Sequence, residues 1–148
     1  MKGFPDLPPI WLVFFLVVNW AVARFIPGNP GSPFFDLLSW GLIGLGLALI
    51  GWSAFWFWRR KTTIEPHHTP GTLIVEGPYR LSRNPIYLGL VIILVGAVIG
   101  RGQPLCLLLV PFFIGILSRR FIQPEEEALR SAFGAEAEAY LARTRRWL

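Results

Sequence analysis

Apolar residues fall into four long blocks that are separated by short polar or glycine- and proline-rich segments. The blocks run over residues 10–26, 34–58, 86–100 and 105–122. A helix that crosses a membrane needs about 20 mostly apolar residues, because the hydrocarbon core is about 30 Å thick. The pattern therefore predicts an all-α protein, a polytopic membrane helical bundle with about four transmembrane helices.

The third block is too short for an ordinary span. At 1.5 Å per residue, the stretch from Ile86 to Gly100 covers only about 22 Å. We therefore expect its start to lie inside the protein, or in a locally thinned membrane. The tight turn "RGQP" makes blocks three and four a helical hairpin. The start of block three and the end of block four should then lie side by side at one membrane surface.

Composition and charge narrow the class of protein. Hydrophobic residues make up 53% of the 148 residues and charged residues only 16%, which is wrong for a soluble domain. The net charge of +5 comes from basic residues that flank the apolar blocks, so it indicates contact with membrane lipids and not with nucleic acid. The single cysteine excludes a disulfide framework, and the adjacent pair His67-His68 is a poor metal site, so no metal is expected.

The basic residues also predict the orientation. Most of them lie in the 59–85 loop and after residue 118. By the positive-inside rule, this loop and both termini are cytoplasmic. We expect one multi-pass domain, 1–148, in a bacterial or archaeal inner membrane.

The 124–148 tail is too polar to span the membrane. Its apolar residues recur at helical spacing, which predicts a cytoplasmic amphipathic helix that is weakened near Gly134 and lies on the membrane or on the 59–85 loop. Within the spans, small residues indicate close helix packing, namely Gly41, Gly44 and Ala48 in block two and "GAVIG" in block three.

The stretch "GPYRLSRNPIYLG" (77–89) allows two interpretations. Asn84 and Pro85 are typical of a helix start, and interfacial Tyr and Arg residues anchor helices in membranes. A helix N-terminus also binds anions, and Arg80 and Arg83 lie one turn upstream, where they suit a carboxylate. The residues alone leave both interpretations open.

The acidic stretch "PEEEALRSAFG" (124–134) is ambiguous in the same way. Acidic residues in the first turn of a helix compensate the helix dipole. Carboxylates at a membrane surface also suit a cationic ligand, such as an amine or a sulfonium. The hairpin places this stretch next to the start of block three.

Together the two stretches resemble a known family. "TLIVEGPYRLSRNPIYLG" and, after a span, "EEEALRSAFGAEAEAYLARTRRWL" are similar to the integral-membrane methyltransferases related to isoprenylcysteine carboxyl methyltransferase and the phospholipid N-methyltransferases. That family has "GxYxxxRHPxYxG", a span, and then a Glu pair leading to "FGxxYxxYxxxVxR". The resemblance covers the chain from about Thr62 onward, and the two-part pattern is more specific than either part.

The resemblance implies S-adenosylmethionine as methyl donor and S-adenosylhomocysteine as product, bound on the cytosolic side. The family pattern implies cofactor contacts at Thr72, Leu73, Ile74, Tyr79, Asn84, Pro85, Ile86, Tyr87 and Glu125, and the tail matches at Tyr140 and Arg143. On physical grounds, Arg80 or Arg83 suits the donor's carboxylate, and the Glu125 region suits its cationic part.

The expected catalytic residues are Glu126, Arg119 and Arg120. Glu126 is the candidate base where the acceptor must lose a proton. The family carries an arginine near the substrate just before the Glu pair, but Phe121 occupies that position here and the two arginines precede it. Asn84 also replaces the family's His, and an amide can act only through hydrogen bonds.

The sequence therefore predicts an S-adenosylmethionine-dependent methyltransferase. Its acceptor would be an apolar or amphipathic molecule in the membrane, such as an isoprenoid, a lipid or a prenyl thiol, that arrives laterally. One alternative is a nicotinamide-dependent membrane reductase of the sterol-reductase type, which has a related "RHxNYxG"-like stretch. The other is a non-enzymatic membrane scaffold whose motif is a capped helix with an aromatic belt.

Overall fold

The computed structural model describes residues 6–26, 32–60 and 73–148, and every regular element in these ranges is a helix. The all-α prediction is therefore confirmed. In chain order, the elements are α1 (Pro8–Phe25), α2 (Pro33–Arg60), η1 (Gly77–Arg80), α3 (Pro85–Arg101), η2 (Pro104–Leu108), α4 (Leu109–Leu117), η3 (Ser118–Ile122), α5 (Gln123–Phe133) and α6 (Ala135–Arg143). The short elements η1 and η2 are 3₁₀ turns, and η3 is a turn of π-helix.

The predicted spans correspond to three long apolar helical stretches and one shorter helix. The long stretches are Pro8–Phe25, Pro33–Arg59 and Pro104–Phe133. The shorter helix is α3, whose 17 residues cover about 26 Å at 1.5 Å per residue. Its start is buried, as predicted, because Asn84 and Tyr87 each expose only 8% of their surface.

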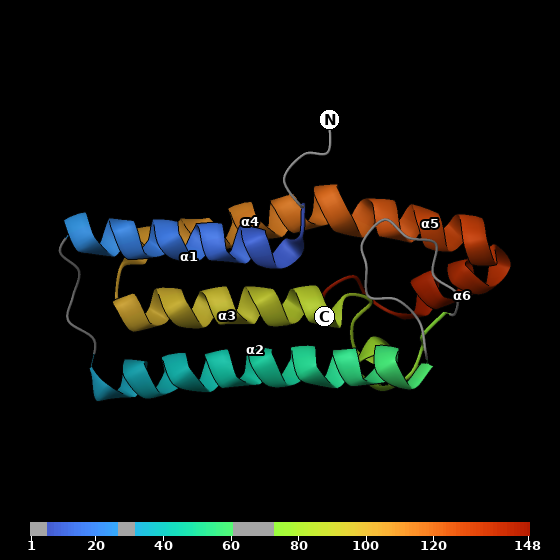
Figure 1. Ribbon diagram of the computed structural model, residues 1–148, viewed down its shortest axis with the longest axis horizontal. Coiled ribbons are helices and arrows are strands. Elements are labelled where there is room, and N and C mark those ends of the chain that lie inside the picture. Colours follow the sequence, from blue (N-terminus) through green and yellow to red (C-terminus); the bar gives the residue numbers. More distant parts are fainter. Residues whose placement is uncertain (1–5, 27–31, 61–72) are drawn as a thin grey trace.

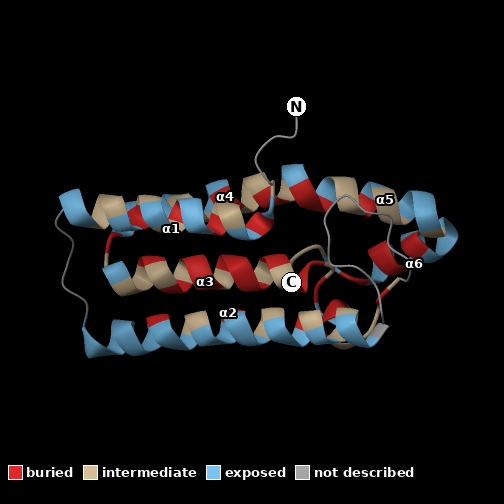
Figure 2. Ribbon diagram, in the orientation of Figure 1, coloured by how far each residue is buried: buried red, intermediate tan, exposed pale blue. Residues whose placement is uncertain are grey.

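Helix α3 is the centre of the bundle. It lies between α2 on one side and α1 with α4 on the other (Figure 1). Most of α3 is buried, whereas α2 is exposed along most of its length (Figure 2). The innermost side chains include Leu94 of α3 and Phe113 and Leu117 of α4, all completely buried. The exposed apolar side chains of α1 and α2 form the surface that suits lipid.

Helices α2 and α3 pack closely at the expected "GAVIG" glycines of α3, but on the α2 side the contact uses a glycine that was not expected. A Cβ on Gly96 would lie 2.9 Å from the carbonyl oxygen of Ser39, and one on Gly100 would lie 2.5 Å from the Ser39 hydroxyl oxygen. A Cβ on Gly46 would lie 2.6 Å from the carbonyl oxygen of Gly89, and one on Gly89 would lie 2.8 Å from the carbonyl oxygen of Gly46. The expectation for Gly41 and Gly44 is wrong, because nothing lies within 4 Å of a Cβ at either position. Hydrophobicity does not distinguish the glycines on the two faces of an apolar helix, and the contact with α3 uses the face that carries Gly46.

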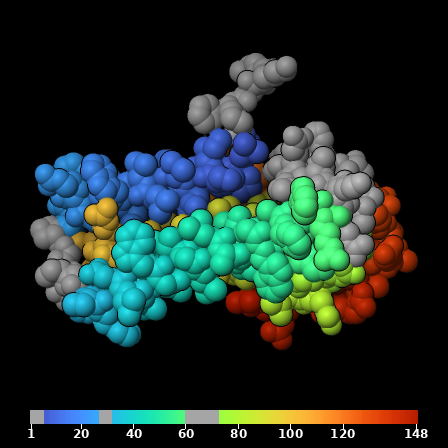
Figure 3. All heavy atoms as spheres, turned by 60° about the horizontal axis from the view of Figure 1, so that its bottom comes forward, coloured from blue at the N-terminus to red at the C-terminus, as the bar shows by residue number. Residues whose placement is uncertain are grey.

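One end of the bundle gathers the polar segments, and we call it the polar end. It comprises residues 73–84, the start of α3, η3, α5, α6 and residues 144–148. The helix that contains α4 continues through η3 into α5, and its apolar part stops at Ile122. Figure 3 shows the C-terminal segments, residues 73–84 and the end of α2 together at this end.

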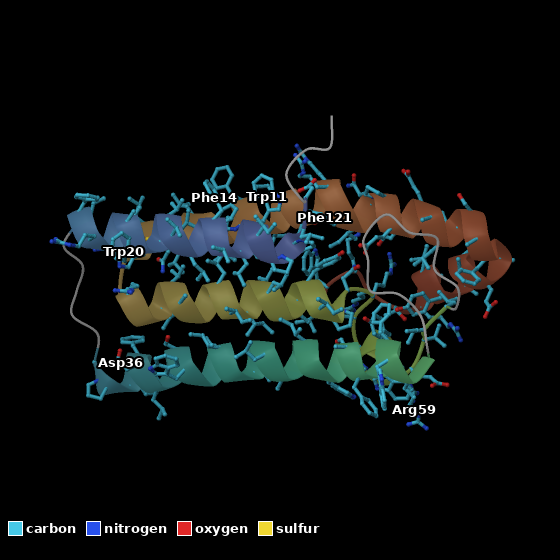
Figure 4. All side chains as sticks on the ribbon, in the orientation of Figure 1. Trp11, Phe14, Trp20, Asp36, Arg59 and Phe121 are labelled. Carbon is cyan, nitrogen blue, oxygen red and sulfur yellow. The ribbon has the colours of Figure 1, made fainter. Side chains whose placement is uncertain are left out.

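The two ends of the bundle differ in charge. Arg59 lies at the polar end and Asp36 at the opposite end of α2 (Figure 4).

The tail forms two helices and not one, because Gly134 has a positive φ of 49° and separates α5 from α6. The predicted weakness at Gly134 is therefore a complete break.

Candidate functional site

The polar end begins with η1, which is held against α2 and α6. Gly77 has a φ of 60°, and a Cβ there would collide with the indole of Trp56. Only glycine fits both the backbone angle and this contact. The ring of Tyr79 packs edge-on against Phe57 with centroids 5.7 Å apart, and its carbonyl oxygen accepts a hydrogen bond from the Tyr140 hydroxyl at 3.0 Å. This stretch is therefore part of the folded end of the bundle and not only a membrane anchor.

Asn84 precedes α3, as predicted, but its side chain does not cap the helix. Pro85 occupies the first turn, and no side-chain cap bond forms at Asn84. Its Nδ2 instead donates to the carbonyl oxygen of Arg146 at 3.0 Å. The Ser82 hydroxyl donates to the same carbonyl oxygen at 3.2 Å and accepts from the Asn84 backbone N–H at 3.1 Å. The amide of Asn84 thus anchors the segment after α6.

Arg83 is engaged inside the protein. Its guanidinium donates to Glu126 Oε1 at 3.0 Å and to the carbonyl oxygens of Leu141 and Thr144. Its backbone N–H donates to the carbonyl oxygen of Arg145 at 2.9 Å. These bonds occupy the Arg83 side chain, one of the two that the sequence predicts for the carboxylate of a bound donor. Arg80, by contrast, is exposed.

Glu126 is the centre of the ionic network. Arg146 donates to both of its oxygens, at 3.0 Å and 2.6 Å, and Arg83 adds the third bond. Burial opposes ionisation of this carboxyl, but the bonds to Arg146 and Arg83 outweigh it and hold its pKa below the usual range. Glu126 is therefore a fixed anion at neutral pH and a weak base.

Glu125 occupies a different environment from its neighbour. It lies beyond the apolar part of the α4–α5 helix, and one of its oxygens accepts a hydrogen bond from the Tyr87 hydroxyl. Burial raises its pKa to about 7, although the bond from Tyr87 acts in the opposite direction. No cationic side chain pairs with Glu125 among the described residues. Its charge is therefore uncompensated by the part of the chain that the structure describes.

The π-helical turn η3 lies just before Glu125 and carries Phe121 on its inner side and two arginines on its outer side. Phe121 is completely buried and packs against the Tyr87 ring with centroids 6.3 Å apart (Figure 4). Arg120 turns to the start of α1, where it pairs with Asp6 at 2.7 Å and lies over the Trp11 ring at 5.4 Å. Arg119 is exposed. The two arginines are thus on the outer side of a helix whose inner side carries Phe121.

The remaining predicted site residues differ in burial. Ile74 and Pro85 are buried, and Leu73 and Ile86 are half-buried. Burial raises the pKa of Tyr140 to about 12, against the opposing charge of Arg83. The remaining predicted tail match, Arg143, is exposed, and its guanidinium donates to the carbonyl oxygen of Ala139 one turn back. Thr72 lies outside the described residues.

Sequence reasoning missed Arg146. It lies after α6, where helical spacing no longer predicts which side chains face inward. Its neighbour Arg145 has the same charge and is exposed. The family pattern carries the signal that could have found it, because the final Arg of "FGxxYxxYxxxVxR", counted from Phe133, falls on Arg146 and not on Arg143.

Two features of the polar end can serve a bound molecule. The Glu125 carboxylate attracts a cation, because it is half-buried beside uncharged Tyr87. The indole N–H of Trp56 is buried and has no hydrogen-bond partner among the described residues. Buried donors are rarely left unpaired, so this N–H is suited to an acceptor that the described residues do not supply.

Comparison with known proteins identifies a family. The model of the phospholipid methyltransferase family matches residues 36–136, about two thirds of the chain. The matched region includes Tyr87, Glu125 and Glu126 but ends before Tyr140 and Arg146. No curated protein and no solved structure matches the chain.

Proposed function

Because the chain belongs to the phospholipid methyltransferase family and has the helices of an integral membrane protein, we propose that it transfers a methyl group from S-adenosylmethionine to an apolar or amphipathic acceptor in the membrane. The observation that carries this proposal is the pair formed by Tyr87 and Glu125. The half-buried Glu125 carboxylate has no cationic partner among the described residues, which costs free energy, and a cationic ligand offsets that cost.

The residues present fit the cationic part of the donor. S-adenosylmethionine carries a sulfonium and an ammonium, and either group beside Glu125 would balance its charge. Trp56 offers a buried hydrogen-bond donor at the same end of the bundle. Arg83 is fully used inside the protein, so we propose the exposed Arg80 for the donor's carboxylate.

The same residues suggest how transfer is promoted. When bound, S-adenosylmethionine supplies an electrophilic methyl group on its sulfonium. Tyr87 orients the Glu125 carboxylate, and the buried rings of Tyr87 and Phe121 keep water from its inner side. Holding reactants in a fixed, dry site is the main source of acceleration for such a displacement.

We assign the proton-accepting role to Glu125 and not to Glu126. A general base works best when its pKa lies near the working pH. The pKa of Glu125 is about 7, whereas that of Glu126 is held low by Arg83 and Arg146. Glu125 would take a proton only from an acceptor that must lose one, such as an amine or a thiol.

The orientation and the acceptor follow from the surface of the bundle. The polar end carries most of the arginines, so we place it in the cytoplasm. Exposed apolar side chains on α1 and α2 border the lipid, which suits an isoprenoid, lipid or prenyl-thiol acceptor that diffuses within the membrane. Membrane lipids are the expected partners.

A transfer assay with labelled S-adenosylmethionine tests this proposal. Purified protein in lipid–detergent micelles is incubated with membrane lipids, isoprenoids and prenyl thiols, and labelled product is measured. We expect label in one of these classes and a loss of about 10²-fold in the Glu125→Gln variant. Absence of transfer, with thermal stabilisation by NADPH but not by S-adenosylmethionine or S-adenosylhomocysteine, would favour a reductase instead.

A further inference from the structure

Arg146 connects the two segments that carry the Tyr87–Glu125 pair. Its carbonyl oxygen accepts hydrogen bonds from Ser82 and Asn84, immediately before α3. Its guanidinium donates to both oxygens of Glu126 in α5, at 3.0 Å and 2.6 Å. One residue therefore holds the start of α3 with its backbone and the start of α5 with its side chain.

These contacts lie next to the residues that meet in the candidate site. Tyr87 follows Asn84 by one helical turn, and Glu125 directly precedes Glu126. A change in the separation of the two segments is therefore transmitted to the hydrogen bond between Tyr87 and Glu125. Side-chain exposure agrees with this role, because Glu126 exposes only 5% of its side chain and Arg146 covers it from outside with 37% exposed.

We propose that Arg146 is a positioning residue, which holds the starts of α3 and α5 at the separation at which Tyr87 and Glu125 meet. The inference rests on the proposed function, since it concerns the geometry of the same site. Arg146 acts through Glu126 and Asn84, and among the described residues no hydrogen bond or ion pair joins it to Glu125 itself.

The pH dependence of kcat distinguishes a change in the site from a simple loss of stability when Arg146 is removed. Glu125 is faced by Tyr87 from α3 and by Tyr79 from η1, while Arg83 and Arg146 pair with the adjacent Glu126. Without Arg146, the segments separate and water reaches Glu125. The carboxyl then ionises more easily, so the acid limb of the kcat profile moves to lower pH.

The test compares Arg146→Ala and Arg146→Lys with the matched control Arg145→Ala. Arg145 has the same charge and an exposed side chain. Its carbonyl oxygen, which the substitution keeps, accepts the hydrogen bond from the Arg83 backbone N–H. For each full-length protein in micelles we would measure kcat and KM, the pH profile, and S-adenosylhomocysteine binding by calorimetry. Hydrogen–deuterium exchange over residues 81–88 reports the bond from the Arg83 N–H to the Arg145 carbonyl oxygen.

We expect Arg146→Ala to lower kcat by about 10²-fold, because small displacements of reacting groups have effects of this size. The same variant should shift the acid limb and speed exchange over residues 81–88. Arg146→Lys should restore part of kcat, since an ammonium still pairs with Glu126 but lacks the fork geometry. The control should match the wild type.

Two results would overturn the inference. One is a wild-type kcat and pH profile in Arg146→Ala; the other is unchanged exchange over residues 81–88. If Arg146→Ala does not fold, Arg146→Lys must still show the lower kcat and the shifted limb, and a wild-type result there counts against the inference. An inactive wild type that binds no S-adenosylhomocysteine would instead contradict the proposed function.

Discussion

Replacing Glu125 by glutamine removes a half-buried charge but keeps an acceptor for the Tyr87 hydroxyl. The variant therefore isolates the cost of ionising this carboxyl in the folded protein. Burial raises the pKa of Glu125 from 4.5 to about 7, so the folded state disfavours the charged form. We expect Glu125→Gln to make the protein more stable at alkaline pH while it lowers methyl transfer.

The size of this effect follows from the two pKa values. A difference of about 2.5 units corresponds to roughly 3 kcal/mol at about 1.4 kcal/mol per unit. Below pH 4.5 the carboxyl is protonated in both states and costs nothing. As the pH rises to about 7, the unfolded chain ionises first and the wild type loses stability. Above pH 7 the loss is complete, and the glutamine variant should be more stable by up to about 3 kcal/mol.

Thermal unfolding in detergent micelles between pH 4.5 and 9 measures this difference. Glu127→Gln is the matched control, because Glu127 lies in the same helix and is exposed. The Tm of Glu125→Gln should equal that of the wild type near pH 4.5 and exceed it by several degrees at pH 8. Equal Tm values at both pH values would refute the view that Glu125 is a partly desolvated carboxylate whose charge is uncompensated.

Four further substitutions test the surroundings of the site and the contact between α2 and α3 by thermal unfolding. Tyr87→Phe should cost about 1–3 kcal/mol at pH 8, because Glu125 loses its donor. Glu126→Gln should cost about 3–5 kcal/mol, because two arginines lose their carboxylate. Since the pKa of Glu126 is held low, this deficit should shrink as the pH falls below about 4.5. Gly89→Ala should cost about 1–3 kcal/mol through its collision with α2, whereas Gly44→Ala, which meets open space, should be neutral or slightly stabilising.

The helices and their neighbours were largely predictable from the sequence. Apolar blocks identify spans because the membrane sets their length. The short turn at 101–104 then makes blocks three and four a hairpin, and the structure brings Tyr87 into contact with Glu125 from these two helices. The length of the third block allowed either a start inside the protein or a thinned membrane, and the structure has the start buried.

The rest depended on three-dimensional contacts that hydrophobic patterns do not encode. Gly46 and Gly44 are equivalent in the sequence, but only Gly46 faces α3. Glu125 and Glu126 are adjacent and identical, yet one meets a tyrosine and the other two arginines. Arg146 acts at a distance of about 60 residues along the chain, through a backbone oxygen as well as its charge.

Calorimetric binding of S-adenosylmethionine, which carries both the sulfonium and the ammonium, to the wild type, Glu125→Ala and Glu127→Ala tests the central claim most directly. We predict that the wild type and Glu127→Ala bind with equal affinity, and that Glu125→Ala binds at least about tenfold more weakly, a loss of about 1.4 kcal/mol or more. All three proteins should have native thermal unfolding. Wild-type affinity in Glu125→Ala, or no binding by the wild type, would contradict the assignment of the donor site to Glu125.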